Sequence, residues 1–180
     1  MEPAPTLDTG NTAWMLASSA LVLMMTIPGL ALFYAGLVRA KNALSLFMQC
    51  MVAAGAVGVL WIIVGYTLAF GTGNAFIGDL SKLGLAGVTL HSVTANFGSP
   101  PPDIPEYLFV MFQAMFAIIT PALILGAIAE RMKFSAWVAF IIIWLLVVVG
   151  AVYAQGSAPA EEKEVLVNGV TDSTVFGIGN

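Results

Sequence analysis

The 180-residue sequence contains little charge, since only 9% of its residues are Asp, Glu, Lys or Arg while 59% are hydrophobic. Soluble domains carry about 25% charged residues, so this composition argues against a soluble globular protein. Disorder is excluded as well, because disordered chains are poor in apolar residues and rich in charge. The sequence therefore predicts a protein that is dissolved in lipid.

Cysteine and histidine are nearly absent. The single cysteine, Cys50, rules out a disulfide framework within the chain and any multi-cysteine metal site, and we interpret it as a small buried apolar residue. The single histidine, His91, rules out an all-histidine metal cage and is interpreted as a solvated loop residue. The sequence also shows no nucleophile paired with a base and no phosphate-binding loop. We therefore expect a protein that is not an enzyme, with no cofactor, metal or nucleic-acid partner.

Charged residues divide the chain into four long uncharged runs. A membrane-spanning helix needs about 20 apolar residues, and none of the runs alternates polar with apolar residues as a membrane strand would. Trimming the polar ends predicts membrane-spanning helices over residues 14–38, 43–70, 107–129 and 136–153. The predicted fold is thus an all-α membrane protein, with a helix bundle over residues 1–154, an extracellular loop over 71–106 and a polar extracellular tail over 155–180. Within the loop, the mildly apolar stretch Ile77–Leu90 is a candidate for a short helix at the membrane interface.

The basic residues predict the orientation of the chain in the membrane. Four of the six follow the first or the third predicted helix, namely Arg39, Lys41, Arg131 and Lys133. Loops rich in Lys and Arg face the cytoplasm. We therefore expect a multi-pass protein of the cell membrane with both termini on the extracellular side.

Small residues and prolines occur inside the predicted helices. Pairs of small residues four positions apart are Ala31/Ala35, Ala54/Gly58 and Ala122/Gly126. Such pairs let helix backbones approach closely in lipid, so they predict a tight bundle. Pro28 and Pro121 are expected to kink the first and third helices, and Thr26 and Thr120 are candidates to replace the lost hydrogen bonds.

No predicted helix contains an internal Asp, Glu, Lys, Arg or His, although proton-coupled pumps and voltage sensors carry such residues at membrane depth. Aromatic side chains are the remaining groups that could interact with a solute. Phe112 and Phe116 lie four residues apart and so share one face of a helix. Two interpretations of this pair stay open: packing or lipid-facing side chains, or an aromatic gate that makes cation–π contacts at the mouth of a pore.

Three stretches of the sequence resemble the ammonium transporter family, the Amt/Mep/Rh group. They are Met25–Asn42 (MTIPGLALFYAGLVRAKN), Leu60-Trp61 with Gly65–Gly71 (GYTLAFG), and Phe112–Ser135 (FQAMFAIITPALILGAIAERMKFS). The similarity covers roughly residues 10–146 and implies the first helices of the eleven-helix ammonium transporter fold, which has two inverted halves. It also implies a lipid-embedded trimer in which each subunit has its own narrow pore.

The resemblance implies ammonium or ammonia as the substrate and assigns five residues to the gate and pore. Phe116 matches the gate phenylalanine, Phe112 lies one turn above it, and Phe33, Tyr34 and Leu123 match positions around the pore. Stripping water from a small cation costs tens of kcal/mol in the idealised limit, whereas a cation–π contact returns about 2 kcal/mol. Aromatic rings can therefore hold ammonium at a wet mouth, but crossing the apolar interior requires loss of a proton or polar groups such as imidazoles.

After Trp144 the sequence departs from the family pattern, and it lacks the binding-pocket tryptophan, both pore histidines and the second half of the fold. We therefore expect a truncated or partial member of the family that functions in ammonium transport, as a homotrimer or together with related subunits, and that conducts little or nothing alone. The alternative is a non-conducting membrane interaction protein that associates with or modulates a full-length ammonium transporter.

Overall fold

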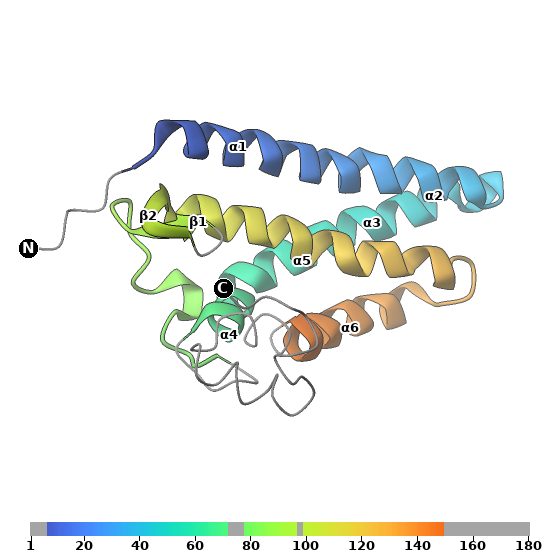
Figure 1. Ribbon diagram of the computed structural model, residues 1–180. Helices are drawn as coiled ribbons and strands as arrows, with labels where there is room; N and C mark the ends of the chain where they lie inside the picture. The colour runs from blue at the N-terminus through green and yellow to red at the C-terminus, as the bar shows by residue number, and fades with distance from the viewer. Residues whose placement is uncertain (1–6, 72–77, 97–98, 150–180) are drawn as a thin grey trace, which may run out of the picture.

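The computed structural model describes residues 7–71, 78–96 and 99–149, and this part of the chain is mostly helical (Figure 1). The first helical segment consists of α1 (Thr9–Met24), a π-helical turn (Met25–Leu30) and α2 (Ala31–Leu37). The second consists of α3 (Ala40–Leu60), a π-helical turn (Trp61–Gly65) and α4 (Tyr66–Phe70). The third is the single helix α5 (Glu106–Ile128), and the fourth is α6 (Phe134–Trp144) with a π-helical turn (Leu145–Val149).

Three of these segments are long and apolar enough to cross a membrane: Thr9–Leu37, Ala40–Phe70 and Glu106–Ile128. They correspond to the first three predicted helices, each beginning slightly earlier than predicted, which confirms a helical membrane protein in general. The fourth predicted helix, 136–153, is described only up to residue 149 and forms a shorter apolar helix. The predicted count of four spans and the sides of the termini stay predictions, and the tail over 155–180 lies outside the described residues.

The two prolines affect their helices differently. The helical geometry is interrupted at Ile27, directly before Pro28, whereas α5 continues through Pro121. The expected repair by threonine is wrong. A proline deprives the carbonyl four residues before it of a partner, but Thr26 Oγ1 donates to Val22 O and Thr120 Oγ1 donates to Phe116 O, one or two positions too early.

The segment between α4 and α5 holds the only strands that the structure describes. Strands β1 (Val93–Asn96) and β2 (Ser99–Pro105) pair in antiparallel fashion. The interfacial helix expected over Ile77–Leu90 is wrong for the described residues of this stretch, in which only a 3₁₀ turn at Leu83–Leu85 forms. Gly84, Leu85 and Gly87 have positive φ angles, which a right-handed helix cannot accommodate.

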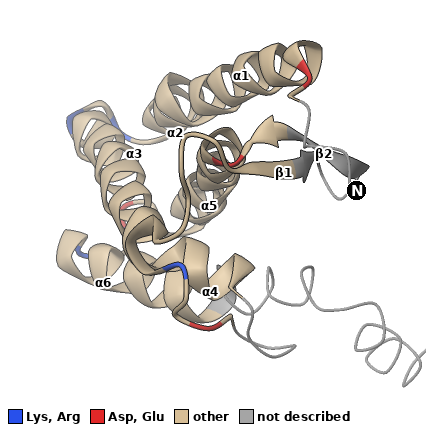
Figure 2. Ribbon diagram, turned by 90° about the vertical axis from the view of Figure 1, so that its left-hand side faces the viewer, with Lys and Arg blue, Asp and Glu red and all other residues tan. Residues whose placement is uncertain are grey.

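Helix α5 is the central element of the fold. It packs against α1 and α3, while α3 also packs against α2 and α6 (Figure 2). In its most apolar stretch 56% of the residues are buried, compared with 17% and 22% in the other two long segments. The sequence cannot reveal this difference, because all three segments have similar hydropathy.

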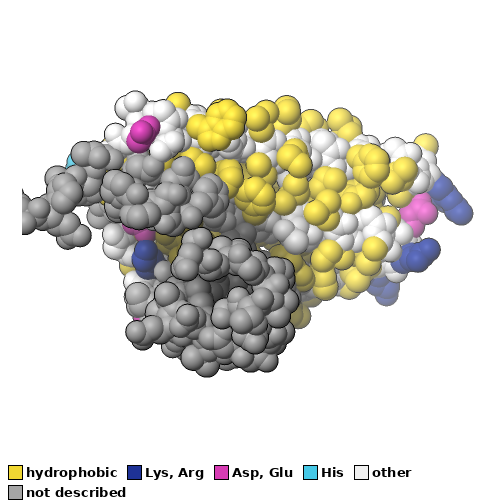
Figure 3. All heavy atoms as spheres, viewed as in Figure 1, with side chains coloured by type: hydrophobic (Ala, Val, Ile, Leu, Met, Phe, Trp, Pro, Cys, Tyr) yellow, Lys and Arg dark blue, Asp and Glu magenta, His cyan; other side chains and the backbone are white. Residues whose placement is uncertain are grey.

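Hydrophobic side chains cover the middle of the molecule, and charged side chains gather at its two ends (Figure 3). Large apolar side chains such as Trp14, Leu37 and Leu44 are about 70% exposed. A soluble protein rarely leaves so much contiguous apolar surface uncovered, whereas a lipid bilayer solvates it. This distribution is that of a membrane-embedded helical protein.

Candidate functional site

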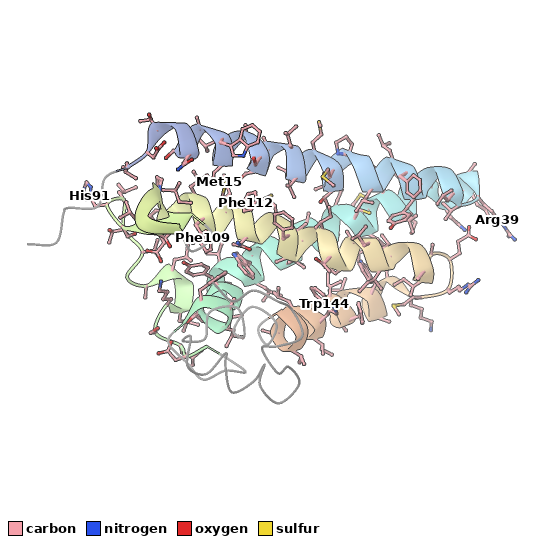
Figure 4. The ribbon with its side chains drawn as sticks, in the orientation of Figure 1. Met15, Arg39, His91, Phe109, Phe112 and Trp144 are labelled. Carbon is pink, nitrogen blue, oxygen red and sulfur yellow. The ribbon has the colours of Figure 1, made fainter. Side chains whose placement is uncertain are left out.

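Phe112 and Phe116 form an aromatic pair on α5. Their ring centroids are 5.0 Å apart and their planes are inclined by 62°, which is the favoured edge-to-face arrangement. Phe112 is 8% exposed, whereas Phe116 is 38% exposed. The pair therefore combines one ring held in the interior (Figure 4) with one ring that a solute or another helix can reach.

Tyr34, Phe33 and Leu123 form a second group. The Tyr34 hydroxyl donates a hydrogen bond to Leu123 O over 3.0 Å, joining α2 to α5 across 89 residues of sequence. The Phe33 ring lies 5.4 Å from the Tyr34 ring and is 60% exposed. Leu123 lies seven residues beyond Phe116 on α5, roughly 10 Å along the helix axis. The structure thus brings three of the five predicted residues together, and the assignment of all five to a gate and pore stays a prediction.

One face of α5 is uncovered by the other described elements. Its exposed residues recur at helical spacing and are Phe116, Thr120, Leu123 and Ala127. This face begins at Phe116 and runs toward the C-terminal end of α5, which Glu130 follows in the sequence. It is therefore the face of α5 on which a solute pathway or an additional helix would lie.

A charged cluster anchors the start of α5. The Glu106 carboxylate accepts hydrogen bonds from Lys82 Nζ at 2.7 Å and from the Tyr66 hydroxyl at 3.0 Å. Lys82 Nζ also lies 5.4 Å from the centre of the Tyr66 ring. The sequence does not indicate this contact, because a separation of 24 residues gives no sign that two side chains meet.

The loop that carries Lys82 is attached to the end of α4. Thr67 Oγ1 donates to Asp79 O at 2.7 Å and accepts the Lys82 backbone N–H at 3.1 Å. The backbone N–H of Gly78 donates to Leu68 O at 2.8 Å. These bonds position the Lys82 side chain beside Glu106, which is the first residue of α5.

At the opposite end, Glu130 joins the two short turns of the fold. Its carboxylate accepts hydrogen bonds from Asn42 Nδ2 at 2.7 Å and from the Arg39 backbone N–H at 3.3 Å. The hydrogen bond from Asn42, supported by the one from Arg39, lowers the pKa of Glu130 below its usual value. The turn between α2 and α3 is thereby tied to the turn between α5 and α6.

An apolar groove of about 480 Å³ lies between α3 and α5. Small residues of α3, including Ala54, Gly55 and Gly58, form one wall, and Met111, Ala114 and Ile118 of α5 belong to the other. No charged side chain lines the groove, and Trp61 and Tyr107 are its aromatic members. In the described part of the chain no cluster of three His, Cys, Asp or Glu side chains forms a metal site, while Cys50 is buried and His91 is exposed.

Comparison with known proteins relates this chain to one family. The model of the Ammonium Transporter Family matches residues 13–155. The ammonium transporter of Mycobacterium tuberculosis strain H37Rv is 47% identical over 148 residues, which cover 76% of this chain and 31% of that protein. The ammonium transporter of Bacillus subtilis is 44% identical over 138 residues, covering 77% of this chain and 33% of that protein.

A solved structure of the same kind superposes on the fold. The crystal structure of Candida albicans Mep2 matches with a TM-score of 0.70 and 32% sequence identity, covering 85% of this chain and 33% of that one. The chain therefore spans about a third of the length of the relatives that it matches.

Proposed function

We propose, since this chain belongs to the Ammonium Transporter Family, that it functions in ammonium transport and supplies one wall of the pathway. The observation that carries the proposal is the aromatic pair Phe112 and Phe116, which lies inside the matched region with one ring buried and one ring accessible. An accessible aromatic face attracts a small cation by about 2 kcal/mol when the cation is partly desolvated. In this proposal Phe116 contacts ammonium at the mouth of the pathway, Phe112 supports its ring, and Phe33, Tyr34 and Leu123 contribute to the wall.

Transfer through the apolar interior needs more than this wall supplies. A cation–π contact is far weaker than the cost of removing water from ammonium. The one histidine of the 180 residues, His91, is an exposed loop residue at one end of the molecule (Figure 4). We therefore propose that additional polypeptide completes the pathway along the uncovered face of α5 and supplies the polar or titratable groups. In this proposal the additional polypeptide comes either from another copy of the chain in a homotrimer or from a related subunit.

A second candidate function is that of a non-conducting interaction protein. The uncovered face of α5 favours it, because an apolar helix face of this kind also suits association with a full-length ammonium transporter. In that case the aromatic pair packs against the partner and does not contact a solute. The two functions predict opposite effects on the uptake of ammonium.

The experiment combines reconstitution with co-expression. We expect the purified chain in liposomes, under an ammonium gradient and with a pH-sensitive dye inside, to give a signal close to that of empty vesicles. Flux well above this control would contradict the need for additional groups. Co-expression with the Bacillus subtilis ammonium transporter then distinguishes the functions, since increased methylammonium uptake supports a conducting assembly and decreased uptake supports the interaction protein.

Phe116→Ala tests whether the aromatic pair is responsible. We expect this variant to remove the effect on uptake, whereas Phe134→Ala, which truncates an exposed phenylalanine at the start of α6, should retain it. The co-expressed proteins are also tested for co-purification. The proposal would be overturned if the chain neither co-purified with the Bacillus subtilis transporter nor changed the uptake of methylammonium.

A further inference from the structure

Gln113 is one of two side chains with an amide or hydroxyl group along the apolar part of α5, between Leu108 and Ile128. The other is Thr120, which is exposed and whose hydroxyl donates to Phe116 O. Gln113, by contrast, is only 8% exposed. The central helix of the bundle therefore carries a polar amide in its interior, directly beside the aromatic pair in the sequence.

The Gln113 side chain has no hydrogen-bond partner in the part of the chain that the structure describes. The other buried polar side chains described there do have partners, since Ser19 and Thr26 bond to their own helix and Thr67 and Glu106 bond to the connection between α4 and α5. An amide that is buried without a partner destabilises a fold, and native proteins leave few such groups. The Gln113 amide is therefore available for a ligand that the described residues do not supply.

Gln113 and Phe116 lie on the same side of α5. Three residues of an α-helix span about 4.5 Å along the axis and leave the two positions about 60° apart around it. Helical side chains lean toward the N-terminal end, so the accessible Phe116 ring leans toward the turn that carries Gln113. That turn lies in the half of α5 nearer to His91, as the position of Phe112 in Figure 4 shows. The Gln113 amide thus lies at the edge of the uncovered face of α5, close to its accessible ring.

An amide oxygen and an aromatic face offer different interactions to a small cation. The ring face attracts positive charge, whereas the carboxamide oxygen has two lone pairs that accept N–H donors. Ammonium and methylammonium carry both a charge and N–H groups, while tetramethylammonium carries the charge alone. An uncharged amide also holds a cation less firmly than a carboxylate does, which suits a site that has to release its ligand.

We propose that Gln113 is a specificity-determining residue whose amide oxygen accepts a hydrogen bond from an ammonium ion in contact with the Phe116 ring. This role rests on the proposed function, in which Phe116 lies at the mouth of the pathway. Together the amide and the ring select cations that carry N–H groups over fully methylated cations of the same charge. A hydrogen bond to a charged group corresponds to about a tenfold or greater difference in affinity, and this sets the size of the selectivity.

The binding of two cations to the purified full chain in a neutral detergent tests this role. Methylammonium and tetramethylammonium are titrated at constant chloride concentration, and saturation-transfer NMR of their methyl protons gives the dissociation constants. We expect Gln113→Leu to weaken methylammonium binding about tenfold and to leave tetramethylammonium binding unchanged, because only methylammonium donates to the amide. Gln49→Leu, the same change in α3, is the matched control and should alter neither constant. Equal losses for both cations, or no loss for methylammonium, would overturn the proposal.

Nitrogen-15 labelling of the glutamine side chains reports on the unsubstituted protein. The sequence contains three glutamines, Gln49, Gln113 and Gln155, so three NH2 groups give signals, which single substitutions assign. Because a hydrogen bond to the amide oxygen polarises the NH2 group, methylammonium should shift the Gln113 signal and tetramethylammonium should not. An unchanged Gln113 signal at methylammonium concentrations that saturate binding contradicts the proposal, and this result does not depend on the folding of Gln113→Leu.

Phe116→Ala separates the role of Gln113 from the proposed function. If Phe116→Ala weakens the binding of both cations while Gln113→Leu changes neither, the contact of ammonium with Phe116 stands and the role of Gln113 is refuted. If the unsubstituted chain binds neither cation, or if Phe116→Ala changes nothing, the contact with Phe116 is refuted and the role of Gln113 with it. Near-ultraviolet circular dichroism verifies that each variant is folded.

Discussion

At the scale of single residues, the Tyr34 side chain of α2 packs against Gly126 of α5. A Cβ atom added at Gly126 would lie 2.5 Å from Tyr34 Cε1 and 3.0 Å from Tyr34 Cζ. The Tyr34 ring cannot move away freely, because its hydroxyl donates to Leu123 O. The Ala122/Gly126 spacing indicated close packing, but it did not indicate an aromatic ring as the partner.

We predict that Gly126→Ala destabilises the protein. Overpacking of this kind costs about 1–3 kcal/mol, and displacement of the Tyr34 ring would also break its hydrogen bond. The measurement is the unfolding midpoint in mixed detergent micelles, followed by tryptophan fluorescence. Gly55→Ala is the matched control, since no atom lies within 4 Å of the added Cβ and alanine favours a helix over glycine. Equal destabilisation by both substitutions would contradict the prediction.

At the scale of elements, the Glu106 cluster joins the long connection to the bundle. Glu106 begins α5, Lys82 belongs to the loop, and Tyr66 begins α4. The Glu106 backbone N–H also donates to Ser92 O, so the segment that leads into β1 is attached at the same point. The connection is therefore held by polar contacts with the largely buried Glu106 carboxylate, with the Glu106 backbone N–H and with Thr67 of α4.

We predict that Lys82→Met loosens this connection. Glu106 then loses its cation while it stays mostly buried, and the expected loss is about 1–3 kcal/mol because the lysine is one-third exposed. Hydrogen exchange of the backbone amides between residues 79 and 92 should accelerate. His91→Ala, an exposed change in the same loop, should leave these amides unchanged.

The same cluster is expected to show coupling between its two charges. The double variant Lys82→Met/Glu106→Gln should lose less stability than the sum of the single changes, because Glu106→Gln removes the unpaired charge. Strictly additive losses would indicate that the salt bridge contributes nothing.

At the scale of the whole molecule, the arrangement of charge defines how the chain lies in a membrane. The helices form an apolar band, with His91 on one side and the basic end, which consists of Arg39, Lys41, Arg131 and Lys133, on the other (Figures 3 and 4). The positive-inside bias favours the basic end in the cytoplasm. The orientation with both termini outside stays a prediction.

Labelling of introduced cysteines measures this orientation. The native Cys50 is fully buried and should not react, so His91→Cys and Met132→Cys each add one accessible thiol. In intact cells a membrane-impermeant maleimide should label the variant at position 91, and it should label the variant at position 132 only after permeabilisation. The reverse result would place the basic end outside.

The sequence by itself determined the membrane class, the three long helices and the shared face of Phe112 and Phe116. These features are local, because the bilayer thickness sets the length of an apolar run and the helical period sets which residues align. Only the tertiary structure decided which distant side chains meet: Tyr34 with Leu123, Lys82 with Glu106, and Asn42 with Glu130. It also decided that α5 lies in the centre and that β1 and β2 form beside it. These contacts depend on how the helices cross and on how a loop folds back. Apolar runs of similar hydropathy do not encode either arrangement in their spacing.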